Sequence, residues 1–564
     1  MIYRIPLIAI AVLVSGCDNE PTATTATFVD SGQSYYGTLE PFADNAVYFV
    51  VTDRFVDGDP GNNQPEQGKP DRGTFDRPIT DLEGRQGNIG YLGGDFRGIL
   101  DNAGYIAEMG FGAVWLTPIV ENPDEAFMGG QGLGEGFFAD KGKTGYHGYW
   151  GVNFYRLDEH LVSPDLDFAG LTSGLDQHGL QTVLDIVCNH GSPSFSMPQD
   201  QPLFAELYDA QGNLVADHQN LAPENLDPDN PLHQFFHREP DIAQLSNIDD
   251  RNPAALDYFA GAYLQWVEQG ADAFRVDTIK HMPHQFWQQF ATRIRAEHPG
   301  FFMFGESFEY NPQKVAEHTW VENGNISVLD FPGQAAANKV FGEGAGFEEL
   351  AAQLYLDDGL YHNPYELMTF YDNHDMPRMD ADETGFIDAN NWLFTSRGIP
   401  VIYYGSEVAF RAGRPEHGGN RDYFGQDNVD LARDHIIRHR LARIGKLRQQ
   451  SPALQRGLQV NLELRGDTAA FYRVYRHEGV AQTALVLLNK GDKAHDFVIE
   501  RWLGEGNWSD AFGGERVTPS AGTLRLSVPP HDVRVLLREG IAADTELHAE
   551  LQRLHANRER RRDR

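Results

Sequence analysis

Short, mostly apolar runs recur along the chain and are separated by segments with helical periodicity. Each run spans four to six residues and is rich in β-branched and aromatic side chains, a pattern that predicts buried strands. The runs are residues 46–51, 112–116, 182–187, 271–276, 301–304, 326–329, 367–370 and 401–404. Eight such strands with helices between them predict an α/β fold of the (β/α)8 TIM barrel type.

The clearest helical segment covers residues 253–269. Its apolar positions on one face are Leu256, Phe259, Tyr263 and Val267. Pro253 stands in the first turn, where a missing amide proton costs nothing, and Gly270 stands where the pattern ends. The segment therefore predicts a helix packed on the barrel just before the fourth strand.

Three regions depart from the barrel pattern. Residues 189–252 are rich in Pro, Asp, Asn and His, show no strong periodicity and are too long for a plain connection, so they predict a small domain inserted after the third strand. From about residue 455, short alternating runs such as 469–475 and 483–488 predict an all-β C-terminal domain. The predicted organisation is a catalytic barrel formed by residues 41–188 and 253–454, an inserted domain of residues 189–252, a C-terminal β-sandwich of residues 455–541 and a charged tail of residues 542–564.

The charged tail ends in an Arg cluster. We expect it to be a solvated, helix-like end of the chain, and a contact with a membrane surface is the weaker alternative.

The N-terminus predicts export. Residues 5–14 are apolar but too few to span a bilayer, which is typical of a signal peptide of residues 1–16. The end of this stretch, Val-Ser-Gly-Cys at 14–17, resembles the lipobox of bacterial lipoproteins, and that resemblance implies lipidation of Cys17. Residues 17–40 are then expected to form a Thr/Ser-rich tether, with the protein anchored in the cell envelope at the periplasmic or extracellular face. A plain secretory signal with a chance cysteine is the alternative.

The chain is long and strongly acidic. It has 564 residues, with 46 Lys+Arg against 82 Asp+Glu and a net charge of −36, and 41% of its residues are hydrophobic, enough for a sizeable core. This charge disfavours nucleic-acid binding, which requires a basic face. A solvated acidic surface explains the charge most simply, and a neutral substrate or cations fit it. Cys188 is the only other cysteine, so no disulfide is expected. As a separate expectation, the protein is a monomer.

Polar residues follow the predicted strands at their carboxyl ends, where barrels of this kind carry their chemistry. In chain order they are Asp185, Asn189, His190, Arg275, Asp277, Glu306, Asn373, His374 and Asp375. Glycosidic cleavage needs a pair of carboxyls, one to attack the anomeric carbon and one to protonate the leaving oxygen. Arg275 lies two residues before Asp277, so both side chains point to one side of the strand and the guanidinium keeps the carboxylate ionised. A single acid of this kind can equally cap a loop, whereas the ordered set favours an active site.

Four of these segments resemble the signature regions of the α-amylase family, glycoside hydrolase family 13. They are Asp-Ile-Val-Cys-Asn-His at 185–190, Phe-Arg-Val-Asp at 274–277, Gly-Glu-Ser at 305–307 and Asp-Asn-His-Asp at 372–375, and residues 110–118 and 398–405 resemble the family's second- and eighth-strand motifs. The resemblance covers about residues 41–454. It implies a retaining mechanism with Asp277 as nucleophile, Glu306 as general acid/base and Asp375 as stabiliser of the transition state. The two working carboxyls are then expected ~5–5.5 Å apart.

The resemblance also implies roles in substrate binding. The residues concerned are His147, Tyr149, Trp150, His190, Arg275, Lys280, His281 and His374. A Tyr stacks on the sugar at the cleavage site in this family, the histidines are expected to bind sugar hydroxyls, and Lys280 and His281 match residues on the leaving-group side. Tyr149 and Trp150 as plain core aromatics, and zinc held by the three histidines His147, His190 and His374, are the alternatives.

Calcium is the expected ion. The loop Asp57, Asp59, Asn62 and Asn63 offers hard oxygen ligands in a tight turn. It looks like the N-terminal calcium loop of cyclodextrin glucanotransferases, which implies that Gly93 and Asp95 complete the site. An Asn/Asp-rich turn without an ion is the alternative.

The resemblance implies a second calcium between the barrel and the inserted domain. Asn189 and the His281 carbonyl match its ligands, whereas Asn247 stands where relatives usually carry Asp. That substitution lowers the charge of the second site.

The favoured activity is that of an endo-acting α-amylase on starch or maltooligosaccharides. A cyclomaltodextrinase or a cyclodextrin glucanotransferase-like enzyme is the second choice, and a non-catalytic glucan-binding lipoprotein comes last. Two features speak against cyclisation: Ala243 aligns with a large residue around which the glucan wraps in glucanotransferases, and only one β domain follows the barrel.

Overall fold

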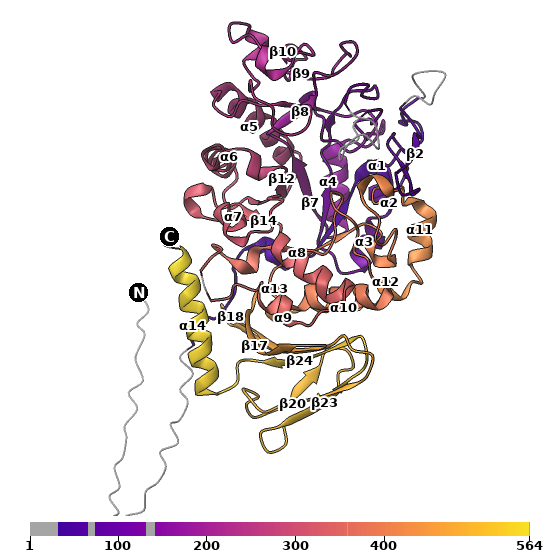
Figure 1. Ribbon diagram of the computed structural model, residues 1–564. Coiled ribbons are helices and arrows are strands. Elements are labelled where there is room, and N and C mark those ends of the chain that lie inside the picture. Colours follow the sequence, from indigo (N-terminus) through magenta and orange to yellow (C-terminus); the bar gives the residue numbers. More distant parts are fainter. Residues whose placement is uncertain (1–31, 66–73, 131–140, 358, 563–564) are drawn as a thin grey trace, which may run out of the picture.

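Eight parallel strands form the centre of the computed structural model, which describes residues 32–65, 74–130, 141–357 and 359–562 (Figure 1). They are β1 (Val47–Val50), β4 (Ala113–Leu116), β7 (Gln181–Ile186), β12 (Ala273–Val276), β13 (Phe302–Gly305), β14 (Ser327–Val328), β15 (Met368–Thr369) and β16 (Ile399–Tyr403). The hydrogen-bonded order is β14-β13-β12-β7-β4-β1-β16-β15, and a parallel bridge between Leu329 and Met368 brings the two edges together. All eight predicted strands and the barrel are confirmed.

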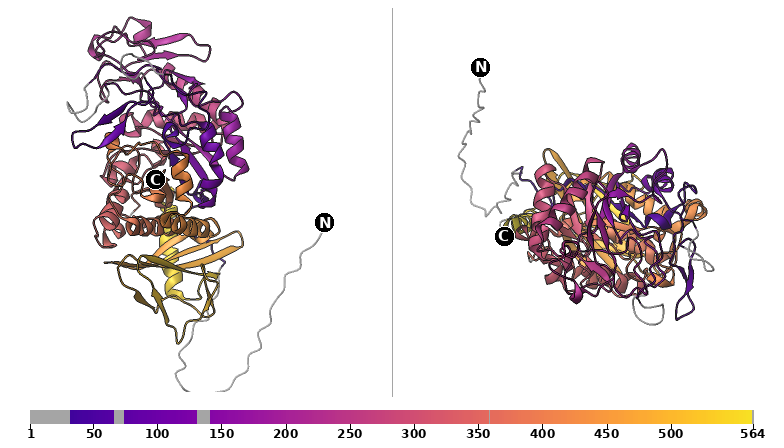
Figure 2. Two further views of the ribbon diagram at one scale, coloured as in Figure 1. Left: turned by 90° about the vertical axis from the view of Figure 1, so that its right-hand side faces the viewer. Right: turned by 90° about the horizontal axis from the view of Figure 1, so that it is seen from above.

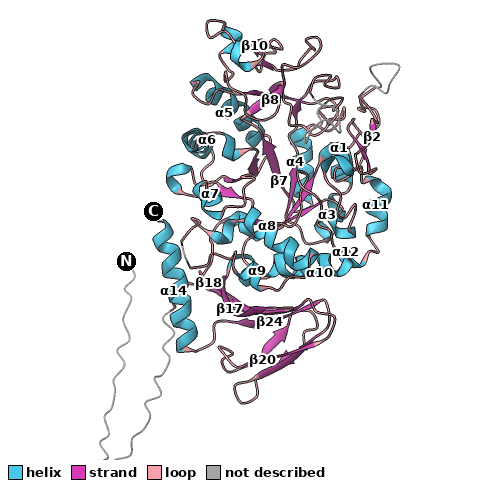
Figure 3. Cartoon of the chain, viewed as in Figure 1, coloured by secondary structure: helices cyan, strands magenta, loops and turns pink. Residues whose placement is uncertain are grey.

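Helices cover the outside of the barrel (Figure 3). The longer ones are α2 (Phe96–Asp101), α3 (Ala103–Glu108), α4 (Phe168–Gln177), α5 (Pro253–Glu268), α6 (His284–Glu297), α7 (Pro312–Glu317), α8 (Phe331–Ala337), α10 (Glu383–Thr395), α11 (Gly425–Ala432) and α12 (Ile436–Gln449), and the shorter ones are α1 (Thr52–Phe55), α9 (Glu348–Ala351) and α13 (Pro452–Arg456). The strands β1, β4, β12 and β13 are buried at every position, because the sheet is enclosed by helices on one side and by its own core on the other. This enclosure is why the strands appear in the sequence as continuous apolar runs.

Helix α5 confirms the predicted segment 253–269. The Asn252 side chain accepts a hydrogen bond from the Ala254 amide and caps the first turn, and Pro253 stands in that turn. Gly270 follows the helix with a φ of 104°, a left-handed conformation that favours glycine. The helix thus begins and ends where its sequence signals lie.

Long loops at the carboxyl ends of the strands carry small antiparallel sheets. In the predicted inserted domain, β8 (His190–Pro193) pairs with β11 (Leu245–Asn247), and β9 (Glu206–Tyr208) pairs with β10 (Leu214–Asp217). Two further hairpins, β2 (Pro78–Thr80) with β3 (Gln86–Asn88) and β5 (Val120–Glu121) with β6 (Asn153–Leu157), extend the loops after β1 and β4. The inserted domain and the C-terminal domain lie at opposite ends of the barrel (Figure 2).

The C-terminal domain is all-β, as predicted, and has an apolar core of its own. Its larger sheet contains β17 (Leu458–Arg465), β18 (Thr468–His477), β19 (Val480–Asn489), β24 (Asp532–Glu539), β21 (Trp508–Asp510) and β22 (Arg516–Val517), and the smaller contains β20 (His495–Ile499) and β23 (Leu524–Val528). The large side chain of Trp508 is fully buried in this core.

Two predictions about the ends of the chain were wrong in part. Helix α14 (Thr545–Arg562) is not merely a solvated tail, because its leucines at helical spacing are buried in the core of the C-terminal domain: Leu547, Leu551 and Leu554. Residues 32–40 of the expected tether are described, and in them Tyr35 is fully buried and forms a bridge with Arg476. The polar Thr/Ser-rich composition of this segment and the high charge of α14 hid these few apolar contacts.

The signal peptide of residues 1–16 and Cys17 lie outside the described residues. In the part that is described, no helix has both the length and the apolar composition needed to cross a membrane.

Candidate active site

One buried guanidinium connects two of the three predicted catalytic residues. Arg275 of β12 is fully buried, and its Nη1 lies 2.7 Å from Asp277 Oδ1. Its Nη2 lies 3.1 Å from Oε1 of Glu306, the residue that directly follows β13. Because neighbouring parallel strands end at the same edge of the barrel, the two carboxyls face the same cation. The structure therefore brings together the acids that the sequence placed on separate strand ends.

The surroundings of Glu306 suit a proton donor. Burial raises the pKa of Glu306 well above its ordinary value, and the nearby charges of Asp375 and Asp277 add to this against the opposing effect of Arg275. A carboxyl of this kind keeps its proton at neutral pH and can give it to a leaving oxygen. The site thus places two carboxyls, Asp277 and Glu306, beside one cation, and a pair of carboxyls is what glycosidic cleavage requires.

Asp185 is a functional carboxyl to which the sequence analysis gave no role. Its Oδ1 accepts a hydrogen bond from Arg275 at 2.8 Å, and its Oδ2 accepts from the Tyr149 hydroxyl at 2.7 Å and from Trp115 Nε1 at 3.0 Å. Burial raises the pKa of Asp185 to about 7. Asp185 therefore orients the side chains of Arg275 and Tyr149. Its position as the first residue of the signature segment 185–190 is the sequence signal that could have revealed this role.

The three histidines are neutral and face the same region. Burial lowers the pKa of His147, His190 and His374. The His374 ring stacks on Tyr149 with ring centroids 5.4 Å apart, and the Nδ1 atoms of His190 and His374 are buried with no hydrogen-bond partner within the protein. Neutral imidazoles of this kind suit the uncharged hydroxyls of a sugar. Among the described residues, the three do not converge as metal ligands.

Trp150 fits the alternative given for it. It is 4% exposed and packs with Phe127, Met197 and Phe204 in a small apolar cluster, so it is a core aromatic that supports His147 from behind. Lys280 and His281 instead line an open cleft of about 730 Å³ that also includes Ser307, the residue after Glu306. This cleft therefore reaches the residue next to Glu306.

The predicted calcium loop contains unsatisfied oxygens. Asn63 Nδ2 donates to Asp57 Oδ2 at 2.7 Å and Asn62 Nδ2 donates to Asp95 Oδ2 at 3.1 Å, which turns both amide oxygens away. The Oδ1 atoms of Asp57, Asn62 and Asn63 are buried and have no hydrogen-bond partner in the protein. A Cβ at Gly93 would lie 2.1 Å from Asn63 Oδ1, so the backbone closes tightly over this oxygen. Buried oxygens without donors are costly, and a hard cation such as Ca²⁺ satisfies them.

The other two predicted ligands of this loop mainly shape it. Asp95 caps α2, and its Oδ1 accepts from the amides of Gly98 at 2.7 Å and Gly58 at 3.1 Å, while its Oδ2 accepts from the Asp59 amide at 2.7 Å. Asp59 Oδ1 accepts from the Gly61 amide at 3.0 Å. Both carboxylates thus hold the turn that presents the unsatisfied oxygens.

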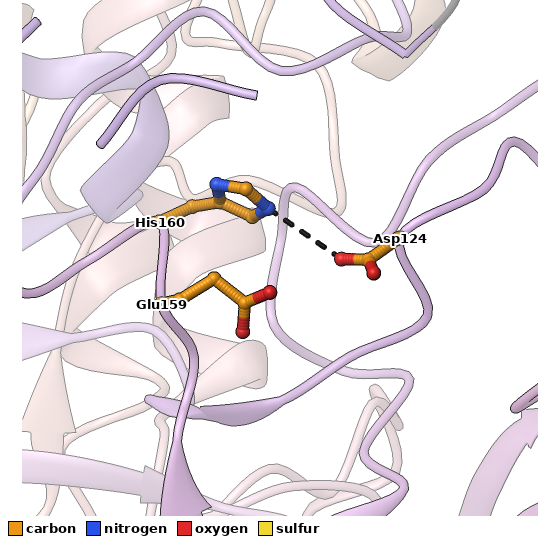
Figure 4. A group of neighbouring side chains, drawn as sticks. All are labelled: Asp124, Glu159 and His160. Carbon is orange, nitrogen blue, oxygen red and sulfur yellow. Dashed lines mark ion pairs between the residues drawn. The ribbon is translucent and has the colours of Figure 1, made fainter. Parts of the chain in front are cut away.

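A neighbouring group, Asp124, Glu159 and His160, has metal-ligand residue types and supports this loop (Figure 4). His160 Nδ1 contacts the Asn62 carbonyl oxygen at 2.8 Å and its Nε2 lies 3.6 Å from Asp124. Burial opposes its protonation, but Asp124 and Asp158 raise the pKa of His160 to about 9. His160 is therefore a protonated ion-pair partner that fixes the Asn62 backbone.

At the predicted second calcium site the structure supplies an acid that the sequence analysis did not name. Asp241 accepts from Asn189 Nδ2 at 3.2 Å and contacts His281 Nδ1 at 3.1 Å. Asn247 instead points its amide at the Glu239 carbonyl, 3.4 Å away. Asn189 and His281 thus meet at Asp241, which the sequence analysis missed because it lies in the irregular inserted domain.

Comparison with known proteins agrees with this geometry. The family model of the alpha amylase catalytic domain matches residues 49–442. A cyclomaltodextrin glucanotransferase of Bacillus sp. (strain 38-2) is 28% identical over 497 residues, which cover 84% of this chain but only 63% of the relative. An alpha-amylase of Niallia circulans is 28% identical over 496 residues, and the match covers 85% of this chain and 85% of that protein. A solved cyclomaltodextrin glucanotransferase with a three-domain ABC distribution is 28% identical, with a TM-score of 0.71, over 88% of this chain and 99% of that one.

Proposed function

Because this chain belongs to the α-amylase family and is a glycoside hydrolase of that type, we propose that it is a retaining, endo-acting α-1,4-glucan hydrolase acting on starch or maltooligosaccharides. The contact of one guanidinium with both Asp277 and Glu306 carries this proposal. It gives the first carboxyl a fixed counter-charge and places it beside a second carboxyl whose pKa burial raises.

The residues then divide the reaction into two steps. Asp277 attacks the anomeric carbon, and the bond to the glycosidic oxygen breaks as Glu306 donates its proton to that oxygen. In the second step, the Glu306 carboxylate takes a proton from water, the water oxygen attacks the anomeric carbon from the face that the leaving group occupied, and the bond to Asp277 on the opposite face breaks. Asp375 and the three histidines hold the ring hydroxyls while positive charge develops at the anomeric carbon.

Calcium belongs to the proposal as a structural ion. Asp57, Asn62 and Asn63 would hold it, and a bound cation would tie the loop after β1 to the start of α2. Asp241, Asn189 and His281 are the residues for a second ion between the barrel and the inserted domain.

Product analysis tests the activity. Protein lacking residues 1–17 is incubated with soluble starch, maltoheptaose or β-cyclodextrin in calcium buffer, and the products are separated by chromatography and their anomeric form is determined. Linear α-anomeric oligosaccharides from starch support the hydrolase. Preferential opening of β-cyclodextrin indicates a cyclomaltodextrinase. Absence of any product would contradict the enzyme, and a Glu306→Gln variant that binds glucan as the wild type does would then support the glucan-binding alternative.

A cyclodextrin glucanotransferase is the second candidate, and cyclic products would establish it. The domain count does not argue against it, because a solved glucanotransferase with three domains is covered to 99% by this chain. The expectation that one β domain after the barrel disfavours cyclisation is therefore withdrawn, and only the small residue Ala243 remains as an argument for hydrolysis.

We also propose a lipid anchor at Cys17 and a place in the cell envelope. The Val-Ser-Gly-Cys segment at 14–17 supports this proposal. Metabolic labelling with a radioactive fatty acid tests it: label in the full-length protein that is lost in Cys17→Ser supports the anchor, and an unlabelled wild type contradicts it.

A further inference from the structure

Arg421 holds the carboxyl that follows β15. Its Nη2 lies 2.6 Å from Asp375 Oδ1, and its Nε donates to the backbone carbonyl of His374 at 3.0 Å. Only 7% of its side chain is exposed. One guanidinium therefore fixes both the carboxylate and the backbone immediately before it, from the loop after β16.

A second acid holds Arg421 in turn. Its Nη1 lies 3.3 Å from Glu416 Oε1, and Lys143 Nζ lies 3.7 Å from the same oxygen. Burial opposes its ionisation, but Arg421, His417 and Lys143 lower the pKa of Glu416 below its ordinary range. Alternating charges thus run from the loop that carries Tyr149 to Asp375.

We propose that Arg421 is a positioning residue that supplies the counter-charge of Asp375 and keeps its carboxylate oriented toward the sugar at the cleavage site, and that Glu416 and Lys143 hold Arg421 in place. This inference rests on the proposed glucan hydrolysis.

The pairing of charges supports this role. Three carboxyls interact at the site, and Arg275 contacts Asp277 and Glu306 while Arg421 contacts Asp375. Without Arg421, the Asp375 carboxylate would face the other two carboxyls with no counter-charge of its own. It would then be less well placed to stabilise the oxocarbenium-like transition state.

The test compares Arg421→Met, Arg421→Lys and the control Arg411→Met. Arg411 lies in the same loop, half exposed, and pairs with Asp422 at 2.7 Å outside the site. We expect Arg421→Met to lower kcat about 100-fold on maltoheptaose, with little change in KM, because the lost interaction acts in the transition state. Arg421→Lys restores most of the activity because it keeps the charge, and Arg411→Met behaves as the wild type.

The pH profile separates positioning from a merely structural role. Loss of a cation raises the pKa of every nearby carboxyl, so both limbs of kcat/KM against pH move to higher pH in Arg421→Met. Inhibition by acarbose, whose ring imitates the distorted sugar, weakens about as much as kcat/KM falls. The charged and titratable groups around Arg421 that take part are Asp375, Glu416, Tyr146, His374, His147, Lys143 and His417.

An unshifted pH profile in a folded Arg421→Met protein, or a loss that Arg421→Lys does not recover, overturns the inference. If thermal unfolding shows that Arg421→Met is not folded, Arg421→Gln replaces it and is judged in the same way. An inactive wild type refutes the proposed function instead, so the two failures are distinguishable.

Discussion

Two regions are rich in buried oxygens: the group of carboxyls at the strand ends around Arg275, called here the strand-end centre, and the loop of residues 57–63. The two regions differ in what interacts with these oxygens. At the strand ends, the carboxyls of Asp185, Asp277 and Glu306 meet the guanidinium of Arg275. In the loop, the Oδ1 atoms of Asp57 and Asn63 are buried without any donor from the protein. The protein supplies the counter-charge of the first centre, whereas it leaves the oxygens of the second for the cation that we propose.

This difference has a functional meaning. A catalytic site must keep its charges in place while substrates come and go, so its counter-charges are covalently part of the fold. A structural loop can take its charge from an ion, because binding then contributes to the stability of the folded state. The two regions should therefore respond to different perturbations.

The largest effect is expected at the nucleophile. Asp277→Asn removes the attacking group and should lower kcat on maltoheptaose by about 10⁴-fold or more. The loss should be equally large on α-maltosyl fluoride, because a good leaving group does not replace a nucleophile. A fluoride rate close to that of the wild type would contradict the role of Asp277.

Glu306→Gln should be almost as damaging on maltoheptaose but much less so for the first step on α-maltosyl fluoride. Fluoride leaves without protonation, so the step that forms the glycosyl-enzyme no longer needs the acid. A rapid burst of fluoride release, followed by slow turnover, is the expected observation. The contrast with Asp277→Asn assigns the two carboxyls separately.

Chelation should act on the loop and leave the strand-end charges intact. With calcium at 100 times its dissociation constant, binding stabilises the folded state by about 2.7 kcal/mol, and EDTA should remove that amount and lower the unfolding temperature. Asn63→Ala should lower the unfolding temperature in calcium and reduce the effect of EDTA to the part that the second ion contributes. Asn213→Ala, in the exposed turn of another hairpin, serves as control. An unfolding temperature of the wild type that EDTA does not change would refute the calcium loop.

The pH dependence of activity tests the carboxyls of the strand-end centre. Because burial raises the pKa of Glu306, activity should persist above the ordinary range of a carboxyl and fall as pH rises through the raised value. The residual activity of Glu306→Gln on maltoheptaose should lack this alkaline limb. An alkaline limb that persists in the variant would assign it to another group.

The smallest effect is expected at Asp241. Its carboxylate already has donors in Asn189 and His281, so this site depends less on an ion than the Asp57–Asn63 loop does. Asp241→Asn should remove one calcium per chain and lower the unfolding temperature less than Asn63→Ala does. Asp229→Asn, an exposed change in the same domain, is the control. Unchanged calcium content in Asp241→Asn would limit the protein to the first site.

The sequence by itself determined the barrel and singled out the candidate acids. Enclosed parallel strands must be apolar at every position, so the eight runs were visible without any tertiary information. The candidate acids were visible because they follow such runs, Asp277 as the first residue after its run, Glu306 as the second and Asp375 as the fifth, and strand ends of a barrel share one edge. Helix α5 was equally determined, since its cap, first-turn proline and final glycine are local signals.

Only the tertiary structure decided how charges are paired. Arg421 and Asp375 are 46 positions apart, and Asp185 meets Arg275 across 90 positions, so no local pattern links them. The same holds for Trp150, whose side chain packs in a small core cluster. It also holds for the leucines of α14, which pack against the sheets of the C-terminal domain. Periodicity records which residues avoid water. Which buried charge meets which counter-charge depends on distances that exist only after the chain has closed.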